Sequence, residues 1–348
     1  MTQNIQADIV VVGAGLVGLA AAVACAKLGK KVIVIDAKKA AIKKQQAWDA
    51  RIYALTASTE AWLQVLGVWA EVDAGRVNDI NAMQLWDEQG NKLALQDADA
   101  NLANLGVIIE HQNLLHALMT QMNALGVTVI TAAECVFLEN AEQEIKLGLA
   151  DGCSISAKLI VAADGVDSWV RQQVNIAIKY KDFNQIAIVA NFVVEKSHQN
   201  IARQWFTPHE TLALLPLPKQ HVSMVWALPT EQAAELLTLP IDVLTEKVQA
   251  KSKSELGGLR MVGKTVSFSL KQQTATQLIA ERIVLVGDAA HQIHPMAGQG
   301  MNLGMRDVRQ LQKMLTNTHA MQDIGEHGFL RKYERARRAD ICYNEHSY

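Results

Sequence analysis

The chain has 348 residues, of which half are hydrophobic and a fifth are charged. This composition provides ample apolar material for a folded protein of two lobes and argues against intrinsic disorder. The 33 basic and 35 acidic residues give a formal net charge of −2, so the chain lacks the positive field that gathers nucleic acid, and small-molecule chemistry is the better expectation.

The four cysteines lie far apart in the sequence and form no CxxC pair. Closely spaced cysteines are the usual sequence signature of a zinc site or of a disulfide framework. We therefore expect neither a metal nor a disulfide, and we interpret the cysteines as packing residues of a cytoplasmic protein.

An uncharged stretch, residues 9–26, is long enough to raise the question of a membrane-spanning helix. The preceding residues 1–8 contain no lysine or arginine, unlike the start of a secretory signal peptide. Within this region an apolar run at 8–12 is followed by three glycines and then by a helix-prone, alanine-rich segment at 19–28. This order predicts a buried strand, a turn and a helix.

Gly13, Gly15 and Gly18 have the spacing of a dinucleotide-binding turn. In such a turn the first glycine makes the tight bend, the second lets a pyrophosphate approach the backbone, and the third lets the helix pack closely on the strand. A second strand is expected at 31–35, and it ends at Asp36, an acid that suits ribose hydroxyls. The alternative is a glycine-rich turn that serves packing alone.

The rest of the chain alternates between strand and helix patterns. A helix is expected at 112–125, strands at 127–130, 135–138, 145–149 and 158–161, a sheet from 185–194, 212–216 and 222–228, a strand at 282–286, and helices around 305–315 and 326–340. The basic, polar residues 38–44 are interpreted as a solvated loop. We find no tandem repeat.

The glycine turn alone does not distinguish NAD from FAD, and two later motifs do so. One is Ala162-Ala163-Asp164-Gly165, after the strand at 158–161, and the other is Gly287-Asp288-Ala289-Ala290-His291, which continues through His294 to Asn302. Together with the glycine turn they resemble the three signatures of the single-component flavoprotein monooxygenases. Residues 51–55, 66–69, 203–206, 214–217 and 287–304 make the chain most similar to the ubiquinone-biosynthesis hydroxylases, and the similarity extends to about Arg337.

This resemblance implies an α/β fold, in which a Rossmann-like FAD-binding domain carries an interleaved, mostly antiparallel β-sheet substrate domain. The FAD-binding domain would be discontinuous and comprise residues 1–75, 105–180 and 272–348. Residues 76–104 and 181–271 would form the substrate-binding sheet that covers the flavin.

Transferred residue by residue, the resemblance also implies the cofactor contacts. It assigns Gly13, Gly15, Leu16, Val17 and Gly18 to the pyrophosphate, Asp36 to the adenosine ribose, Arg51 to the phosphate or ribityl region, Gln112 and Asp164 to the cofactor, Val136 to the adenine, and Asp288 to the ribityl chain. The alternatives are that Arg51 forms a surface ion pair and that Gln112 is an ordinary helix-start residue.

The segment from Pro295 to Asn302 is expected to meet the flavin ring. Pro295, Gly298, Gln299 and Gly300 are the catalytic candidates, and Gly300, Met301 and Asn302 are expected to bind the cofactor. A helix starting near Gly300 would direct backbone N–H groups and its dipole at the anionic end of a reduced flavin. His291 and His294 are alternatives as bases, although histidines beside a cofactor often only pack or hydrogen-bond.

The resemblance implies that FAD, reduced by transiently docked NAD(P)H, uses O₂ to hydroxylate the ring of a polyprenylated phenol. Such a substrate suggests a peripheral position at the inner face of a membrane. One alternative is a C-terminally shortened, non-catalytic FAD-binding subunit of a ubiquinone-biosynthesis complex. The other is a flavin-dependent halogenase, because Trp226 resembles half of that group's tryptophan motif, although Met224 stands where the second tryptophan belongs.

Relatives in this group usually continue well beyond residues 333–337, and the missing part is usually helical. We therefore expect an apolar face near the end of the chain, through which it self-associates or binds a partner or membrane. Its members would be Leu311, Met314, Leu315, Phe329, Leu330 and Tyr333, which recur at helical spacing. The alternative is that these side chains pack on the FAD-binding domain.

Overall fold

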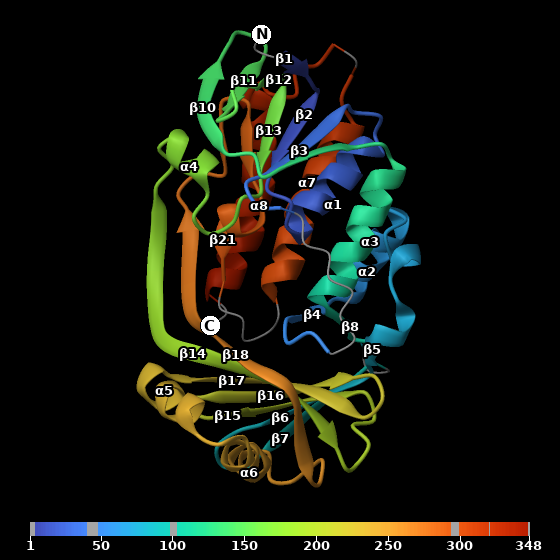
Figure 1. Ribbon diagram of the computed structural model, residues 1–348, viewed down its shortest axis with the longest axis vertical. Coiled ribbons are helices and arrows are strands. Elements are labelled where there is room, and N and C mark those ends of the chain that lie inside the picture. The colour runs from blue at the N-terminus through green and yellow to red at the C-terminus, as the bar shows by residue number, and fades with distance from the viewer. Residues whose placement is uncertain (1–3, 40–47, 98–102, 294–298, 320, 347–348) are drawn as a thin grey trace.

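The computed structural model describes residues 4–39, 48–97, 103–293, 299–319 and 321–346. It has an upper α/β part and a lower part built on one broad sheet (Figure 1). The helices are α1 (Leu16–Ala26), α2 (Ala57–Val65), α3 (His111–Ala124), α4 (Trp169–Gln173), α5 (Thr230–Thr238), α6 (Ile241–Lys251), α7 (Gln299–Thr316) and α8 (His327–His346), with short 3-10 turns η1 (Trp69–Glu71), η2 (Ala74–Arg76) and η4 (Gly287–Ala289).

A six-stranded sheet forms the centre of the upper part, in the order β19-β20-β13-β2-β3-β9. Its strands are β2 (Ile9–Val12), β3 (Val32–Asp36), β9 (Thr128–Thr131), β13 (Leu159–Ala162), β19 (Ile279–Ala280) and β20 (Ile283–Leu285). All neighbours are parallel except β19 and β20. Helix α1 packs on this sheet, and side chains of β11 and β12 are buried in the same core. Strands buried on both faces need apolar side chains throughout, which explains why β2 and β20 are uninterrupted apolar runs. The strands predicted from these runs are confirmed.

Two smaller sheets flank the central one. A four-stranded sheet has the order β1-β12-β11-β10, with β1 (Asn4–Gln6), β10 (Cys135–Asn140), β11 (Ile145–Leu149) and β12 (Ser154–Ala157). A three-stranded antiparallel sheet has the order β4-β8-β5, with β4 (Ile52–Leu55), β5 (Val77–Ile80) and β8 (Gly106–Glu110). The three-stranded sheet brings Arg51 and the start of β4 close to the start of α3, because Ile52 pairs with Glu110 and His111 follows β8 directly.

The lower part is an eight-stranded sheet in the order β21-β18-β14-β17-β16-β15-β6-β7. Its strands are β6 (Ala82–Trp86), β7 (Lys92–Gln96), β14 (Ile178–Val194), β15 (Ile201–Phe206), β16 (Thr211–Leu217), β17 (His221–Pro229), β18 (Leu259–Ala275) and β21 (His291–Gln292). Every pair is antiparallel except β15 with β6. The long strands β14 and β18 run from the upper part down into this sheet (Figure 1).

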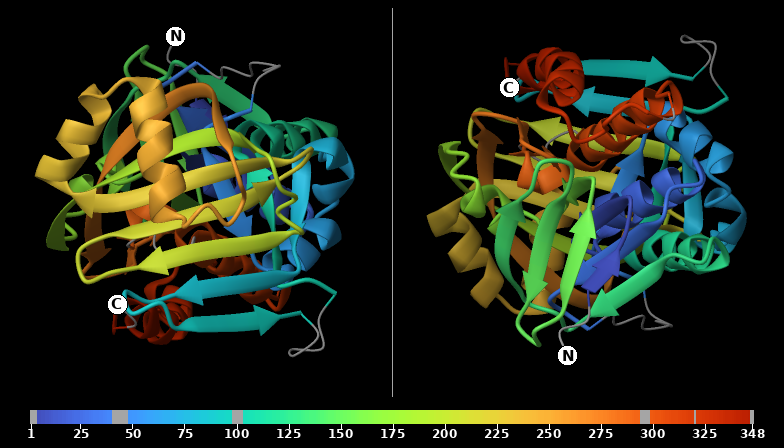
Figure 2. Two further views of the ribbon diagram at one scale, coloured as in Figure 1. Left: turned by 90° about the horizontal axis from the view of Figure 1, so that it is seen from below. Right: turned by 90° about the horizontal axis from the view of Figure 1, so that it is seen from above.

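The two faces of the eight-stranded sheet have different partners. Seen from below, α5 and α6 lie across its lower face (Figure 2). Phe192, Met224 and Trp226 point to that side and form a second core with these helices. Because side chains alternate along a strand, Asn191 and Ser223, paired across β14 and β17, point to the opposite, upper face. The substrate sheet implied by the resemblance is therefore present.

The helices at the end of the chain are well packed. Leu311 and Leu330 are fully buried, and the buried Tyr333 hydroxyl donates to the carbonyl oxygen of Leu285 at 2.9 Å. Leu315 and Phe329 are also buried in the main core. The expectation that these residues form an exposed apolar face is wrong, because they are buried in the main core, where α7 packs on α1 and α8 packs on α7 and β19.

Among the residues that the structure describes, no helix combines the length and the apolar character needed to cross a membrane.

Candidate active site

The glycine turn joins β2 to α1, and its first and third glycines are required by close packing. A Cβ on Gly13 would lie 2.3 Å from the carbonyl oxygen of Ala163, and the backbone of Gly13 has φ of +106°, which favours glycine. A Cβ on Gly18 would lie 2.0 Å from the carbonyl oxygen of Gly13. These two glycines therefore let the turn, the helix and the end of β13 approach one another.

Gly15 differs, because nothing lies within 4 Å of the position that its Cβ would take. Its backbone is extended, with φ of −72° and ψ of 175°, a conformation that any residue adopts. The fold itself therefore does not require glycine at this position. The open space lies where a ligand would approach the start of α1.

The start of α1 offers unpaired backbone donors to such a ligand. Gly15 is the N-cap of α1, no side chain caps the helix, and its first turn contains no acid. Leu16 is buried in the core and Val17 packs on Gly287 and Gly304, so both offer only backbone N–H groups at this end. A helix N-terminus in this state is a ready site for a phosphate group.

Asp36 stands at the end of β3, next to the glycine turn. Its Oδ2 accepts the N–H of Ala14 at 2.7 Å and its Oδ1 accepts the N–H of Lys38 at 2.7 Å. These bonds fix the carboxylate at the carboxyl edge of the parallel sheet. A carboxylate has about four acceptor positions, so lone pairs remain for ribose hydroxyls.

The loop after β13 carries Asp164, whose two oxygens differ. Oδ2 accepts the N–H of Val170 at 3.0 Å, whereas the buried Oδ1 has no hydrogen-bond partner among the described residues. Burial raises the pKa of Asp164, although hydrogen bonds from Ser168 and the Val170 backbone oppose this effect. A buried acceptor without a partner is costly, and a ligand hydroxyl would satisfy it.

The loop after β20 is held by a buried ion-pair network that the sequence analysis missed. Asp307 of α7 accepts the N–H of Gly287 at 2.9 Å, pairs with His291 Nε2 at 2.6 Å, and pairs with Arg337 Nε of α8 at 2.7 Å. Burial acts to raise the pKa of Asp307, but the charges of His291 and Arg337 outweigh it and lower that pKa. His291 thus holds the loop in place through Nε2, while its buried Nδ1 has no hydrogen-bond partner among the described residues.

A sequence signal for Asp307 existed. It lies midway between the buried Leu303 and Leu311, so it is an acid on the apolar stripe of a helix. An acid at such a position needs a buried partner, and Arg337 supplies it. The repeat that predicted the helix therefore also pointed to this ion pair.

Asp288 follows Gly287 and is open to solvent, although protein surrounds it. Desolvation by that surrounding protein raises the pKa of Asp288, and the charge of His291 partly opposes the rise. We call the surroundings of this exposed but desolvated carboxylate the Asp288 recess. A ligand in this recess would meet the Asp288 side chain directly.

Arg51 and Tyr53 approach the same recess from β4. The Tyr53 hydroxyl lies 3.2 Å from His111 Nδ1 at the start of α3. Burial, opposed by the charge of Arg51 and reinforced by Asp288, raises the pKa of Tyr53 to about 12. Arg51 and Asp288 therefore act on one hydroxyl, although 236 residues separate them in the chain. Arg51 is exposed and has no ion pair within the described part of the chain.

Gln112 and Val136 lie at the two other edges of the region. Gln112 is the second residue of α3, and its buried Oε1 has no partner among the described residues. Val136 is exposed and stands at an irregularity of β10 between Cys135 and Phe137. Burial, reinforced by Asp164 and Asp36, raises the pKa of the neighbouring Cys135 thiol to about 12, which places this end of β10 near both carboxylates.

The catalytic candidates are only partly covered by the structure. Pro295 and Gly298, like His294, lie outside the described residues. Gln299 and Gly300 are half-buried at the start of α7, where backbone N–H groups face away from the helix. Met301 follows them and is half-buried as well.

The side chain of Asn302 is hydrogen-bonded within the protein. Its Oδ1 accepts the N–H of Thr56 at 3.0 Å and the hydroxyl of Thr59 at 2.8 Å, and its Nδ2 donates to the carbonyl oxygen of Ala54 at 2.8 Å. The side chain therefore ties α7 to β4 and α2. Asn302 would therefore contact a cofactor only through its backbone.

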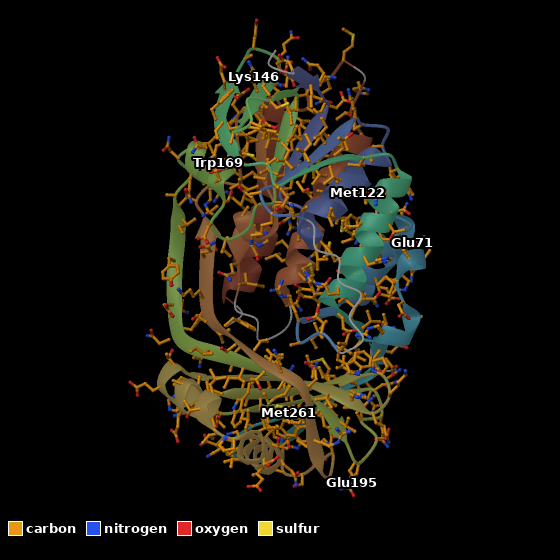
Figure 3. All side chains as sticks on the ribbon, in the orientation of Figure 1. Glu71, Met122, Lys146, Trp169, Glu195 and Met261 are labelled. Carbon is orange, nitrogen blue, oxygen red and sulfur yellow. The ribbon has the colours of Figure 1, made fainter. Side chains whose placement is uncertain are left out.

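The glycine turn, Asp36, Asp164 and Gly287 lie at or just after the carboxyl ends of β2, β3, β13 and β20. Figure 3 labels Trp169 of α4 and Met122 of α3 on either side of this sheet. Ligands of open parallel sheets bind at this edge. The open space at Gly15, the two buried acceptors without partners and the desolvated Asp288 all fit an elongated ligand with phosphates and many hydroxyls. FAD has this chemistry.

The halogenase alternative is not supported by the position of Trp226. Its indole Nε1 donates to Glu210 Oε2 at 2.9 Å, and the ring lies in the lower core with α5 and α6. Met224 is fully buried in the same core. Both side chains therefore point away from the cofactor region.

Comparison with known proteins agrees with this assignment. Residues 6–342 match the family described as FAD binding domain. The chain is 34% identical over 337 residues to ubiquinone hydroxylase UbiL of Rhodospirillum rubrum, covering 96% of this chain and 78% of that protein. It is 32% identical to 3-demethoxyubiquinol 3-hydroxylase of Escherichia coli, covering 97% of this chain and 87% of that protein.

Among solved structures, PqsL of Pseudomonas aeruginosa has the same fold. It aligns with a TM-score of 0.78 at 18% sequence identity, over 97% of this chain and 94% of that one. The α/β fold with an interleaved antiparallel sheet is thus a known architecture. With its glycine turn, its two later loops and a match over nearly its entire length, the chain belongs to the FAD binding domain family.

Proposed function

We propose that this protein is an FAD-dependent monooxygenase that hydroxylates the aromatic ring of a polyprenylated quinone precursor, using NAD(P)H and O₂. The observation that carries the proposal is the open space at Gly15, at the uncapped start of α1 and beside the fixed carboxylate of Asp36. The similarity to UbiL and to 3-demethoxyubiquinol 3-hydroxylase supports the reaction class.

In this proposal FAD, when bound, supplies the redox chemistry with NAD(P)H and O₂. The residues of this chain bind and orient it. The start of α1 and Gly15 would hold the pyrophosphate, Asp36 the adenosine ribose, and Asp288 the ribityl hydroxyls. Asp164 and Gln112 would use their free acceptor atoms, and Arg51 would reach a phosphate from the exposed side.

The start of α7 would contribute electrostatic stabilisation. Its first N–H groups, at Gln299 and Gly300, have no partners within the helix and carry the positive end of the helix dipole. Directed at the pyrimidine end of the flavin, they would stabilise negative charge there without a lysine. Gly300 leaves space, since a Cβ there would have Ile293 at 3.9 Å as its nearest neighbour.

The upper face of the eight-stranded sheet suits an apolar substrate. On that face Val189 of β14 is paired with Val225 of β17, and Val225 is paired with Ala213 of β16. On its other side Val189 is paired with Val266 of β18. Val266 and Phe268 are 42% and 46% exposed on the free edge of β18. Together they form an apolar wall that would hold a prenylated ring and exclude water from the reaction.

The test is product formation with labelled oxygen. FAD-loaded protein should oxidise NADH or NADPH with a short-chain prenylated phenol, and mass spectrometry should find one ¹⁸O atom from ¹⁸O₂ in the product. If FAD is bound but neither nicotinamide is oxidised with or without the phenol, the chain is instead a non-catalytic FAD-binding subunit. Complementation of strains that each lack one ubiquinone hydroxylase would identify the ring carbon.

A further inference from the structure

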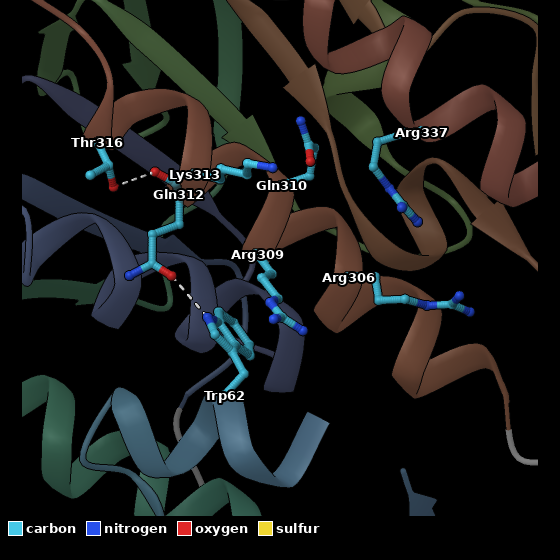
Figure 4. Close-up of a pocket in the computed structure, with 8 residues that line it drawn as sticks. All are labelled: Trp62, Arg306, Arg309, Gln310, Gln312, Lys313, Thr316 and Arg337. Carbon is cyan, nitrogen blue, oxygen red and sulfur yellow. Dashed lines mark hydrogen bonds between the residues drawn. The ribbon is translucent and has the colours of Figure 1, made fainter. Parts of the chain in front are cut away.

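A pocket lined by basic side chains lies away from the candidate active site, between α2, α7 and α8. Its volume is about 450 Å³, within the range of roughly 300–1,000 Å³ typical of small-molecule sites. Figure 4 shows Arg306, Arg309 and Lys313 of α7, Arg337 of α8 and Trp62 of α2 around it. The residues assigned to the cofactor lie elsewhere, so FAD does not account for this pocket.

Helical spacing places the basic residues on one side of α7. Positions 306, 309 and 313 are separated by three and four residues, so their side chains project from successive turns of the same face. Arg337 adds a guanidinium from a second helix. A ligand in the pocket would therefore meet positive charge from two directions.

The carboxylates near the pocket neutralise only part of this charge. Asp340 accepts from Arg306 Nη1 at 2.7 Å and from Arg337 Nη1 at 2.6 Å, and Asp307 accepts from Arg337 Nε. Arg309 donates to the neutral Ser58 hydroxyl at 2.9 Å, and Lys313 has no ion pair among the described residues. Within the described part of the chain, no carboxylate lines the pocket itself.

Two buried donors of these arginines are also unsatisfied. Arg337 is 5% exposed, and its Nη2 has no hydrogen-bond partner among the described residues. The same holds for the buried Nε of Arg306. A buried N–H of a permanent cation without an acceptor is costly, and a negative charge bound nearby would reduce this cost.

We propose that this pocket binds a phosphate group. Guanidinium groups match the oxygens of phosphate with paired hydrogen bonds, and a phosphate presents oxygens in several directions, as donors from two helices require. A carboxylate, with two oxygens in one plane, would leave some of these donors unused. The Trp62 ring, whose Nε1 donates to Gln312 Oε1 at 2.8 Å, gives the pocket a rigid apolar side.

The phosphate could belong to a soluble compound or to a lipid headgroup, and the experiment separates these sources. FAD-loaded protein is titrated at low salt with inorganic phosphate and with pyrophosphate, by calorimetry. In parallel it is sedimented with vesicles of phosphatidylcholine alone and with vesicles that contain phosphatidylglycerol. The variant carries Arg309→Gln and Lys313→Gln, two exposed positions outside the cofactor site.

A matched control carries Arg331→Gln and Lys332→Gln, two exposed residues of α8 that do not line the pocket. It removes the same net charge. We expect the pocket variant to lose about tenfold or more in affinity for its ligand, while the control stays within about twofold, because charge-assisted hydrogen bonds depend on position.

Pocket-dependent binding of phosphate or pyrophosphate, without a preference for anionic vesicles, would support a soluble phosphorylated ligand. Pocket-dependent sedimentation with phosphatidylglycerol vesicles would support a lipid headgroup. Equal losses in both variants, or no binding of any probe by the wild-type protein, would overturn the proposal. Hydroxylase activity is not needed for any of these outcomes, so they are independent of the proposed function.

Discussion

Replacing Gly15 with valine tests whether the open space at the glycine turn binds a ligand or is only a gap in the packing. The side chain of Gly15→Val points into space where nothing lies within 4 Å of Cβ, and the backbone conformation suits any residue. The stability of the FAD-free protein should therefore remain within about 1 kcal/mol of wild type. The change should act only on a ligand that approaches the backbone.

The expected loss of FAD follows from the donors at the start of α1. If the valine displaces the pyrophosphate from two backbone N–H groups, each charge-assisted bond is worth about 1.5–3 kcal/mol. The loss would be roughly 3–6 kcal/mol, or a decrease in affinity of about a hundredfold or more. Flavin content after purification and fluorescence titration of the FAD-free protein measure the affinity, and urea unfolding measures stability.

Gly18→Ala is the contrasting variant. Its Cβ would lie 2.0 Å from the carbonyl oxygen of Gly13, so it should destabilise the FAD-free protein itself, by about 1–3 kcal/mol or more. Gly15→Val that folds normally and keeps wild-type FAD affinity would refute the assignment of this turn to the pyrophosphate. Gly15→Val that unfolds the FAD-free protein would contradict the geometry on which the argument rests.

Three further predictions follow from the loops around the recess and from the core. Asp288→Ala should weaken FAD by about 1.5–3 kcal/mol in a fluorescence titration, and wild-type affinity would make Asp288 a turn residue only. Because its pKa is raised in the folded protein, ionising Asp288 lowers the stability of the FAD-free protein as pH rises above about 3.8, so Asp288→Asn should flatten this part of the pH–stability curve. Asp307→Asn leaves Arg337 paired with Asp340 and should lower the free energy of unfolding, measured with urea, by about 3–5 kcal/mol. Asp340→Asn removes the more exposed pair and should lower the free energy of unfolding clearly less. Leu330→Glu would place a charge at a fully buried position and should lower stability by about 3–5 kcal/mol; a variant that stays as stable as wild type would show that the end of the chain does not pack as described.

The outcome at the end of the chain shows where pattern analysis fails. Leu311, Leu315 and Leu330 recur at helical spacing, and this spacing correctly indicated helices. Spacing says which residues share a face but not what covers that face. The structure buries the face in the main core, against α1 and β19, so the pattern gives no reason to expect self-association.

Asn302 and His291 show the same limit at the site. Both lie in a motif that the sequence assigned to the cofactor region. However, Asn302 donates to the carbonyl oxygen of Ala54 and accepts from the N–H of Thr56, and His291 Nε2 is paired with Asp307. A motif locates a segment near a ligand, but only the packing shows which side chains of that segment remain free.

The sequence by itself determined the local elements and the cofactor class. Uninterrupted apolar runs predicted β2, β3, β13 and β20, since strands buried on both faces need apolar side chains throughout, and glycine spacing predicted the turn at Gly15. Both signals are short-range. The tertiary structure alone decided which charged and titratable groups lie near one another: Asp288 and Tyr53, Arg337 and Asp307, and the basic residues around the pocket at Trp62. These contacts join segments that are far apart in the chain, and their energies depend on burial and distance, which no local pattern encodes.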